Sequence, residues 1–331
     1  MCNILVIGDT HGEWGYLASL LLYYQPDICL VTGDFGWWPG LGELPHLALP
    51  REVMQHTQIH FLDGNHENHQ SLLAAAPRGS FTSQEIAPNI VYHPRGSLMQ
   101  LPDGRRVFFA GGAKSIDWKQ RIRGKTWFPE EILRPSHLPK ELPQADIVLS
   151  HTIPSAFKVE KYADWGFFDV RYDFSPDKSQ ETLNQVLQAC KPQLWLAGHY
   201  HRRIDGHFAA TEYHVLDMLY GGLCRPEGLP CTFWLSGGPG IQRQSPGWAL
   251  PHQAFIPLVE NASGLYACAD MRELPWDLAR LFAKRRTMYR TQKVDGIKGL
   301  VPREADSFLN CLCRFHWDPL AALGDRKRDP T

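Results

Sequence analysis

Several features that would place a chain in a broad class at once are missing from this sequence. No apolar stretch approaches the about 20 residues that a membrane-spanning helix needs, and typical runs such as Ile4 to Ile7 are far shorter. Neither an internal repeat nor a low-complexity segment is present. We therefore expect neither a membrane-spanning protein nor a repeat array, and no membrane partner.

An excess of charge of one sign is also missing. Lys and Arg number 34 against 35 for Asp and Glu, so the formal net charge is -1. This balance gives no overall field that would attract nucleic acid or an acidic membrane, although a local basic patch is compatible with it. The apolar fraction of 44% and the charged fraction of 21% are those of an ordinary soluble globular protein.

The eight cysteines form no pattern of a disulfide framework. None belongs to a Cys-x-x-Cys pair, and Cys311-Leu312-Cys313 alone is a weak metal signal. No charged-then-apolar leader precedes the first apolar run. We therefore expect buried free thiols and a cytoplasmic location.

Three short apolar runs near the start of the chain each end in a glycine or an aspartate. The runs Asn3 to Ile7, Ile28 to Thr32 and Gln58 to Leu62 are typical of buried strands. Helices are expected at Glu13 to Tyr24, where leucines recur at helical spacing, and at Glu67 to Ala76. The pattern predicts a strand-helix-strand unit with polar residues at the strand ends.

Short alternating runs follow from Asn89 to Gly111, with a turn at Pro102-Asp103-Gly104, and predict antiparallel strands. Further elements are expected as strands at Ala145 to Leu149 and Gln193 to Ala197, a helix at Ser179 to Ala189, and a hairpin at Arg203 to Leu216. We expect one domain over residues 1–217 and a carboxyl-terminal extension over 218–331. The extension has a Pro/Gly-rich part and two expected helices, Pro275 to Arg290 and Glu304 to Phe315.

Five short polar blocks occupy the ends of the expected strands. They are Gly8-Asp9-Thr10-His11-Gly12, Gly33-Asp34-Phe35-Gly36, Gly64-Asn65-His66-Glu67, Ser150-His151 and Gly198-His199-Tyr200-His201. Mixed oxygen and nitrogen donors of this kind suit Mn, Fe or Zn rather than Ca. Two such ions about 3.5–4 Å apart can bind a phosphate oxygen and activate a hydroxide. One block alone is weak evidence, but all five together predict a two-metal site that cleaves phosphoesters.

In type and order these blocks resemble the calcineurin-like metallophosphoesterase family, whose pattern is D-x-H, GD, GNH followed by D or E, H, and GH-x-H. The resemblance implies an α/β fold of the α+β type, a four-layer β-sandwich flanked by helices. It also implies a dinuclear-metal hydrolase in which a metal-bridging hydroxide attacks phosphorus in line. The implied ligands are Asp9, His11 and His201 on the first ion, Asn65, His151 and His199 on the second, and Asp34 between them.

Two neighbours of the ligands take roles from the same resemblance. His66 is the implied general acid, which protonates the leaving oxygen. Glu67 matches the acidic position after it, where we expect a role in orienting a ligand. The implied cofactors are two divalent ions, with Mn as the first choice and Fe, Zn, Co or Ni as alternatives.

The loop from Gly111 to Arg123 is a candidate substrate site. Its two glycines follow an expected strand, and Arg121 and Arg123 could bind phosphate; a solvated surface loop is the equal alternative. Trp127 to Glu131 then has a proline suited to a first helical turn.

Trp37 and Trp38 follow Asp34, at the place where the protein serine/threonine phosphatases that share these blocks carry an Asp-Arg pair. The absence of that pair argues against a protein phosphatase and against a dinucleoside tetraphosphatase. Trp37 could form a wall for a base-like leaving group, but packing is the favoured interpretation.

The favoured function is hydrolysis of a phosphomonoester or a small phosphodiester. A nuclease acting on DNA or RNA is the first alternative, supported by Lys284-Arg285-Arg286 and by the loop at Lys114 to Arg123, but opposed by the balanced net charge. A non-catalytic metal-binding scaffold is the second alternative, which the intact ligand set and His66 oppose. The sequence does not define an oligomeric state.

Overall fold

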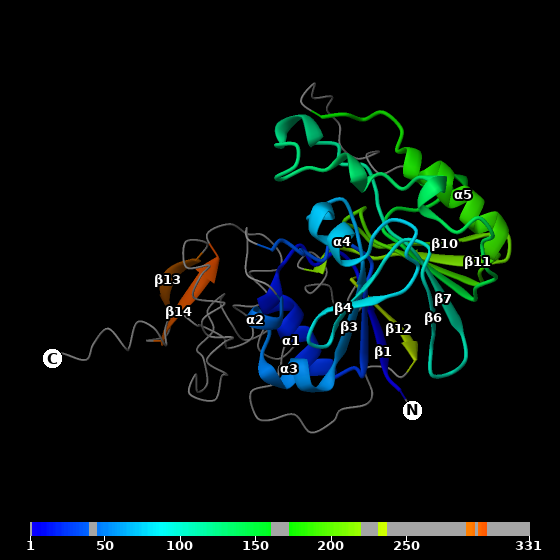
Figure 1. Cartoon of the computed structure of the whole chain (residues 1–331). Helices are drawn as coiled ribbons and strands as arrows, with labels where there is room; N and C mark the ends of the chain where they lie inside the picture. The colour runs from blue at the N-terminus through cyan, green and yellow to red at the C-terminus, as the bar shows by residue number, and fades with distance from the viewer. Residues whose placement is uncertain are drawn as a thin grey trace.

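The computed structural model describes residues 2–39, 45–159, 172–219, 231–236, 289–294 and 297–302. Within them, two mixed six-stranded sheets face each other, and a separate two-stranded ribbon lies at the carboxyl-terminal side (Figure 1). The ribbon consists of β13 (Tyr289–Val294) and β14 (Ile297–Pro302), which pair antiparallel.

The first sheet has the strand order β12-β1-β2-β3-β5-β4. Its four central strands are parallel, and both edge strands run antiparallel to their neighbours. The strands are β1 (Ile4–Ile7), β2 (Ile28–Val31), β3 (Gln58–Leu62), β4 (Gln84–Ala87), β5 (Ile90–His93) and β12 (Thr232–Ser236). The helices between them are α1 (Trp14–Tyr24), α2 (Pro45–Ala48), α3 (Arg51–His56) and α4 (His69–Ala75).

The second sheet has the strand order β10-β11-β9-β8-β7-β6. Here too the four central strands are parallel and the edge strands antiparallel. The strands are β6 (Leu98–Gln100), β7 (Arg106–Ala110), β8 (Ile147–Ser150), β9 (Leu194–Ala197), β10 (Ile204–Phe208) and β11 (Thr211–Val215). The helix α5 (Lys178–Cys190) belongs to this half, with the 3-10 turns η1 (Trp118–Gln120), η2 (Pro129–Glu131), η3 (Pro135–His137) and η4 (Ser155–Phe157).

The continuous apolar strands have both faces buried. Along β1, Ile4 and Val6 pack with residues of the second sheet such as Phe109, so this cluster lies between the sheets. Leu5 belongs instead to the cluster that contains Leu17 of α1. This alternation is the period-2 geometry of a strand, and here it separates two cores. On the far side of the second sheet, residues of α5 pack against Trp195. The layers are therefore helix, sheet, sheet and helix (Figure 1), which confirms the predicted sandwich.

Most predicted elements of residues 1–217 are found within a few residues of their expected bounds, but two details differ. The segment Asn89 to Gly111 does not form one antiparallel unit, because β5 pairs parallel with β3 while β6 and β7 form a hairpin in the other sheet. The helix expected from Glu67 begins only at His69, since the Asn68 side chain caps it by accepting from the Ser71 amide at 3.0 Å.

The residues after the predicted domain boundary include β12, which forms an edge of the first sheet beside β1. The division at residue 217 itself stays a prediction. Of the helix predicted at Pro275 to Arg290, the described residues Tyr289 and Arg290 lie in β13 instead, and the remainder lies outside the described residues, as does the helix predicted at Glu304 to Phe315. No helix among the described residues has the length and apolar character needed to span a bilayer.

Candidate metal centre

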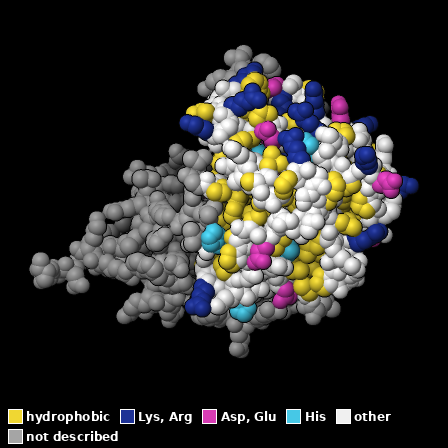
Figure 2. Space-filling view, in the orientation of Figure 1, with side chains coloured by type: hydrophobic (Ala, Val, Ile, Leu, Met, Phe, Trp, Pro, Cys, Tyr) yellow, Lys and Arg dark blue, Asp and Glu magenta, His cyan; other side chains and the backbone are white. Residues whose placement is uncertain are grey.

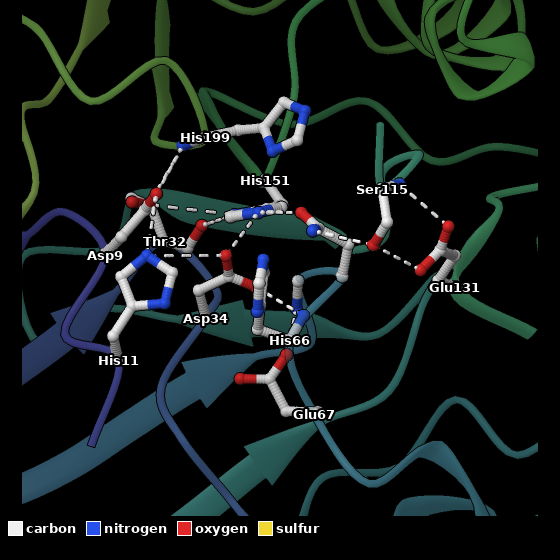
Figure 3. Close-up of polar contacts among 12 residues, drawn as sticks. Asp9, His11, Thr32, Asp34, His66, Glu67, Ser115, Glu131, His151 and His199 are labelled. Carbon is white, nitrogen blue, oxygen red and sulfur yellow. Dashed lines mark hydrogen bonds and ion pairs between the residues drawn. The ribbon is translucent and has the colours of Figure 1, made fainter. Parts of the chain in front are cut away.

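Polar residues from both sheets meet where the parallel strands end (Figure 3). Asp9 follows β1, Asp34 follows β2, and Asn65 follows β3 in the first sheet. His151 follows β8 and His199 follows β9 in the second sheet. Because the carboxyl ends of parallel strands share one edge, residues up to 190 positions apart come within hydrogen-bonding distance there.

The loops that carry these residues adopt uncommon backbone conformations. His11, Asp34, His199 and His201 have φ values of 48°, 47°, 67° and 52°, in the left-handed region that few non-glycine residues occupy. Such strain persists only where surrounding contacts impose it, and it is concentrated at functional sites. At Gly64 the chain approaches Asp34 so closely that a Cβ would lie 2.2 Å from its Oδ1 atom, so only glycine fits there.

Four side chains form a first candidate ligand group. Asp9, His11, Asp34 and His201 each offer one donor atom, and these atoms all lie within 4.8 Å of one another. The Nε2 atoms of His11 and His201 are 3.1 Å apart, and His201 Nε2 is 3.2 Å from Asp9 Oδ2. Donors bound at about 2.1 Å from one ion are separated by roughly 3.0–3.4 Å. The spacing and the donor chemistry both fit a divalent transition metal.

A second group shares Asp34 with the first. The Oδ2 atom of Asp34 lies 3.7 Å from His11 Nε2 and 3.4 Å from His151 Nε2. His151 Nε2 is also 3.0 Å from Asn65 Oδ1. The Nδ1–H of His151 donates to the Thr32 carbonyl at 2.8 Å, which leaves Nε2 as the ligating atom. Asp34 therefore lies between the two groups, and its assignment as the ligand shared by two ions stays a prediction.

His199 contributes to the site through its backbone in this structure. Its amide lies 2.9 Å from each carboxylate oxygen of Asp9. Its imidazole lies beside that of His151, with ring centroids 4.8 Å apart, on the side away from Asp34 (Figure 3). The assignment of the His199 ring as a ligand of the second ion stays a prediction.

The charges of the site compensate one another. Burial alone would raise the pKa of Asp34, but His151 and the neighbouring imidazoles hold that pKa well below its usual range. Burial conversely disfavours the charged form of His151, yet Asp34 and Asp9 raise its pKa to about 9. The two buried carboxylates thus favour the protonated, positively charged form of His151. A divalent ion can replace that proton.

His66 lies at the rim of the two groups. Its backbone amide donates to Asp34 Oδ1 at 2.7 Å, and the guanidinium of Arg121 lies 2.7 Å from its Nε2. Burial lowers the pKa of His66 to about 3, with the charge of Arg121 acting in the same direction and Asp34 opposing it. The imidazole is therefore neutral in this environment.

Glu67 lies beneath the loops rather than beside the ligands. Its Oε1 accepts from the Gly36 amide at 3.2 Å and its Oε2 from the Gly64 amide at 2.6 Å. Burial, followed by the charge of Asp34, raises the pKa of Glu67 well above its usual range. These contacts tie together the loops that carry Asp34 and Asn65, and the role of Glu67 in orienting a ligand stays a prediction.

The candidate substrate residues are placed differently from one another. Arg121 reaches the site, bound also by Asp117 at 2.8 Å. Arg123 is exposed in a turn that bridges to Trp127. Trp37 is 7% exposed and packs within the core near Phe61, which favours packing over substrate contact.

The double glycine before this loop is closely packed against neighbouring residues. A Cβ on Gly111 would lie 2.5 Å from Asp63 Oδ1, and one on Gly112 would lie 2.5 Å from the Glu131 carbonyl. Lys114 likewise turns away, and its Nζ atom donates to the carbonyl of Ser175 at 2.7 Å. The two glycines are therefore needed for close packing, and the Lys114 side chain does not face the candidate ligands.

Sequence reasoning did not single out Ser115 and Glu131 as site residues. Ser115 Oγ accepts from the Asn65 amide at 3.0 Å and lies 2.7 Å from Glu131 Oε2. The only available signal was that both lie in the loop region after β7, which the strand ends place beside the ligands.

Comparison with known proteins agrees with this geometry. The family model described as calcineurin-like phosphoesterase matches residues 2–203. A lariat debranching enzyme of Caenorhabditis briggsae is 22% identical over 253 residues, which cover 64% of this chain and 48% of the relative. One of Drosophila melanogaster is 24% identical over 249 residues, covering 64% and 44%. The chain thus spans about half the length of the curated relatives it matches.

Solved structures overlap with this chain in part. The match to TT1561 of Thermus thermophilus has a TM-score of 0.35 at 12% identity. It covers 67% of this chain and 91% of the TT1561 chain. Phosphopantetheinyl hydrolase from Mycobacterium tuberculosis has a TM-score of 0.37 at 11% identity, covering 73% and 98%. Because the family model spans more than half of the chain and includes every motif block, the chain belongs to the calcineurin-like phosphoesterases, hydrolases that act on ester bonds.

Proposed function

We propose that the protein is a phosphoesterase that depends on two divalent metal ions and cleaves a phosphodiester, with a phosphomonoester as the alternative substrate. The observation that carries the proposal is the position of Asp34, whose Oδ2 atom lies near His11 on one side and His151 on the other. Two ions held this way supply a nucleophile at neutral pH and stabilise charge on the phosphoryl group. Mn is the first choice, and Fe, Zn, Co and Ni suit the same donors.

The chain's own residues take three roles in this proposal. Asp9, His11, Asp34 and His201 hold the first ion, and Asn65, His151 and His199 complete the second with Asp34. Arg121, beside His66 at the rim, binds a phosphate oxygen through its planar guanidinium. His66 then donates its ring proton to the leaving oxygen, a contribution of about 10²–10⁴-fold.

The preference for a diester rests on the relatives, which are named for lariat debranching. A nuclease is the second candidate, and a specific surface supports it. Lys119, Arg123 and Lys125 are exposed in the loop that carries Arg121, and Ile122 there is 61% exposed. Figure 2 shows many Lys and Arg side chains in the upper part of the visible face. A cationic loop beside the site would contact the phosphates that flank the cleaved bond.

The test is turnover by Mn-loaded protein on phosphomonoesters, cyclic and linear dinucleotides and oligonucleotides. We expect metal-dependent cleavage of a diester, with Asp34→Ala inactive and poor in bound metal. Cleavage of oligonucleotides that weakens steeply with salt would support the nuclease. A protein that binds two ions per chain and turns over none of these substrates would overturn the proposal and favour a non-catalytic scaffold.

A cytoplasmic location remains part of this proposal, and it rests on the cysteines. The four described cysteines, Cys2, Cys29, Cys190 and Cys231, are all free. Burial raises the pKa of the Cys190 thiol to about 11, so this thiol is protonated and unreactive at neutral pH.

A further inference from the structure

Asn65 differs from the other candidate ligands because its side-chain amide has two unlike ends. Only Oδ1 has lone pairs for a metal ion, whereas Nδ2 carries two hydrogens and cannot ligate. In this structure Oδ1 faces His151 Nε2 at 3.0 Å and Nδ2 donates to Ser115 Oγ at 3.0 Å. Rotation of the amide by half a turn would exchange the two ends and remove a ligand from the second ion.

Ser115 lies at the Nδ2 end of the Asn65 amide. The Ser115 amide donates to Glu131 Oε1 and its hydroxyl donates to Oε2, each at 2.7 Å (Figure 3). A carboxylate only accepts, so the single hydroxyl proton of Ser115 is committed to Glu131. The Ser115 Oγ atom then has no proton left to donate to Asn65. It can only accept a hydrogen bond, so it favours the NH₂ end of the Asn65 side chain.

Arg95 binds the backbone beside Glu131 and links it to the loop that carries Asn65. Arg95 donates to the carbonyls of Glu130 and Glu131, both at 2.9 Å, and forms an ion pair with Asp63 at 2.6 Å. Asp63 immediately precedes Gly64 and Asn65 in the chain. Glu131 is 1% exposed, so no water competes for its carboxylate.

We propose that Ser115 and Glu131 are positioning residues of the metal centre, which fix the Asn65 amide with its oxygen toward the second ion. The inference rests on the proposed function, because it assigns the second ion to Asp34, Asn65 and His151. Groups one contact behind a ligand typically change metal affinity by 10–100-fold when they are replaced.

Two substitutions test this role in different ways. Ser115→Ala removes the acceptor for Asn65 Nδ2. Glu131→Gln keeps the shape of the side chain but adds a donor, so the Ser115 proton is no longer committed and the amide loses its preferred orientation. Burial raises the pKa of Glu131 to about 7, so at pH 8 the carboxylate is mostly ionised at a cost in stability that Gln avoids. Glu131→Gln should therefore bind metal more weakly while unfolding no more easily.

A matched control is Ser97→Ala. Ser97 is also buried, at 1% exposed, but its Oγ has no hydrogen-bond partner among the described residues. Its replacement should leave metal binding unchanged.

The experiment is Mn²⁺ titration at pH 8, followed by calorimetry and by electron paramagnetic resonance, with metal-free thermal melts of every variant. The wild type and Ser97→Ala should bind two ions and show the spectrum of a coupled pair. Ser115→Ala and Glu131→Gln should bind the first ion normally, bind the second about 10–100-fold more weakly, and show an isolated ion at limiting Mn²⁺.

Second-ion affinity equal to that of the wild type in folded Glu131→Gln would overturn the inference, and this variant decides the matter if Ser115→Ala does not fold. A wild type that binds fewer than two ions would instead overturn the proposed metal centre, and the inference with it. A wild type that binds two ions but hydrolyses nothing would overturn the proposed activity alone.

Discussion

At the scale of single residues, the pairing of His66 with Arg121 is the feature closest to the proposed chemistry. Arg121 lies against the imidazole and is held by Asp117, so one cation contacts the candidate acid directly. Burial lowers the pKa of the His66 ring to about 3, and the positive charge of Arg121 acts in the same direction. General acid catalysis by His66 should matter most for a leaving oxygen that needs a proton as it departs.

We predict that His66→Ala impairs an alkyl phosphodiester more than a p-nitrophenyl diester. An alkoxide needs a proton as it leaves, whereas p-nitrophenolate is stable without one. The ratio of kcat/KM between wild type and variant should be at least about tenfold larger for the alkyl substrate. Both substrates are compared on protein of equal metal content, and equal losses would count against the acid role.

A second residue-scale prediction concerns His60, which is 5% exposed and pairs with His93 at 2.8 Å. Burial lowers the pKa of His60 to about 4 from 6.5. As pH falls from about 6.5 to about 4, the unfolded chain takes up a proton that the folded chain refuses, so folding stability is lost. The loss amounts to about 3 kcal/mol at most.

This loss is measured as the difference in unfolding free energy between wild type and His60→Gln at a series of pH values. Glu67 and Glu131 have raised pKa values and change stability in the opposite direction, but they are common to both proteins and cancel. The wild type should lose stability relative to His60→Gln on acidification. A difference that is constant between pH 7 and pH 4.5 would contradict the prediction.

At the scale of elements, the loop between β7 and η2 depends on a contact with the segment before α5. Lys114 Nζ forms an ion pair with Asp173 at 3.1 Å and donates to the Ser175 hydroxyl at 2.6 Å. Trp118 Nε1 donates to the same aspartate at 2.9 Å. The loop that carries Ser115 and Arg121 is therefore fixed at both its start and its first turn.

We predict that Lys114→Met raises KM for a phosphoester with little change in binding of the first ion. Loss of the ion pair and hydrogen bonds frees the loop and misplaces Arg121, while the first ligand group lies on other loops. The cost in stability should be about 1–3 kcal/mol, typical of lost charged hydrogen bonds. Lys119→Met is the control, since Lys119 is exposed and lies in the same loop. An unchanged KM in Lys114→Met would show that the contact does not position Arg121.

The elements that sequence could predict are those in which local pattern and tertiary environment agree. The strands β1 and β2 are apolar and buried on both faces, and β3 is buried after its first residue, so their sequences indicate these strands directly. The short helices α2 and α3 were missed because their sequences show no sustained periodicity. The predicted antiparallel pairing of β5 was wrong because pairing depends on which sheet the strand joins, and no local sequence pattern determines that.

In the candidate site, the ligand residues could be predicted from the sequence but the contacts that support them could not. Ligand residues are recognisable because each block is short and contiguous, and the structure brings six of the seven side chains into two adjoining groups. Contacts across the fold gave no such signal. Ser115 and Glu131 are 16 positions apart in a loop region, and Asp63 and Arg95 are 32 positions apart in the loops after β3 and β5, so neither pair forms a motif.

At the scale of the whole molecule, the candidate ligands are divided between the two sheets. We predict that Mn²⁺ at about 100 times its dissociation constant raises the unfolding free energy by about 2.7 kcal/mol per ion, because only the folded chain assembles both groups. Thermal melts with Mn²⁺ and with a chelator should differ by roughly 5–10 °C. Asp34→Ala should show little of this shift. Equal melting temperatures with and without metal in the wild type would contradict the prediction.

The division between sheets has a consequence for a severed chain. Asp9, His11, Asp34 and Asn65 all precede the link from β5 to β6, whereas His151, His199 and His201 follow it. A chain cut in that link would leave each fragment with an incomplete set of donors. Retained metal would then measure how well two separately made fragments reassemble, so the site could serve as a built-in reporter of their association.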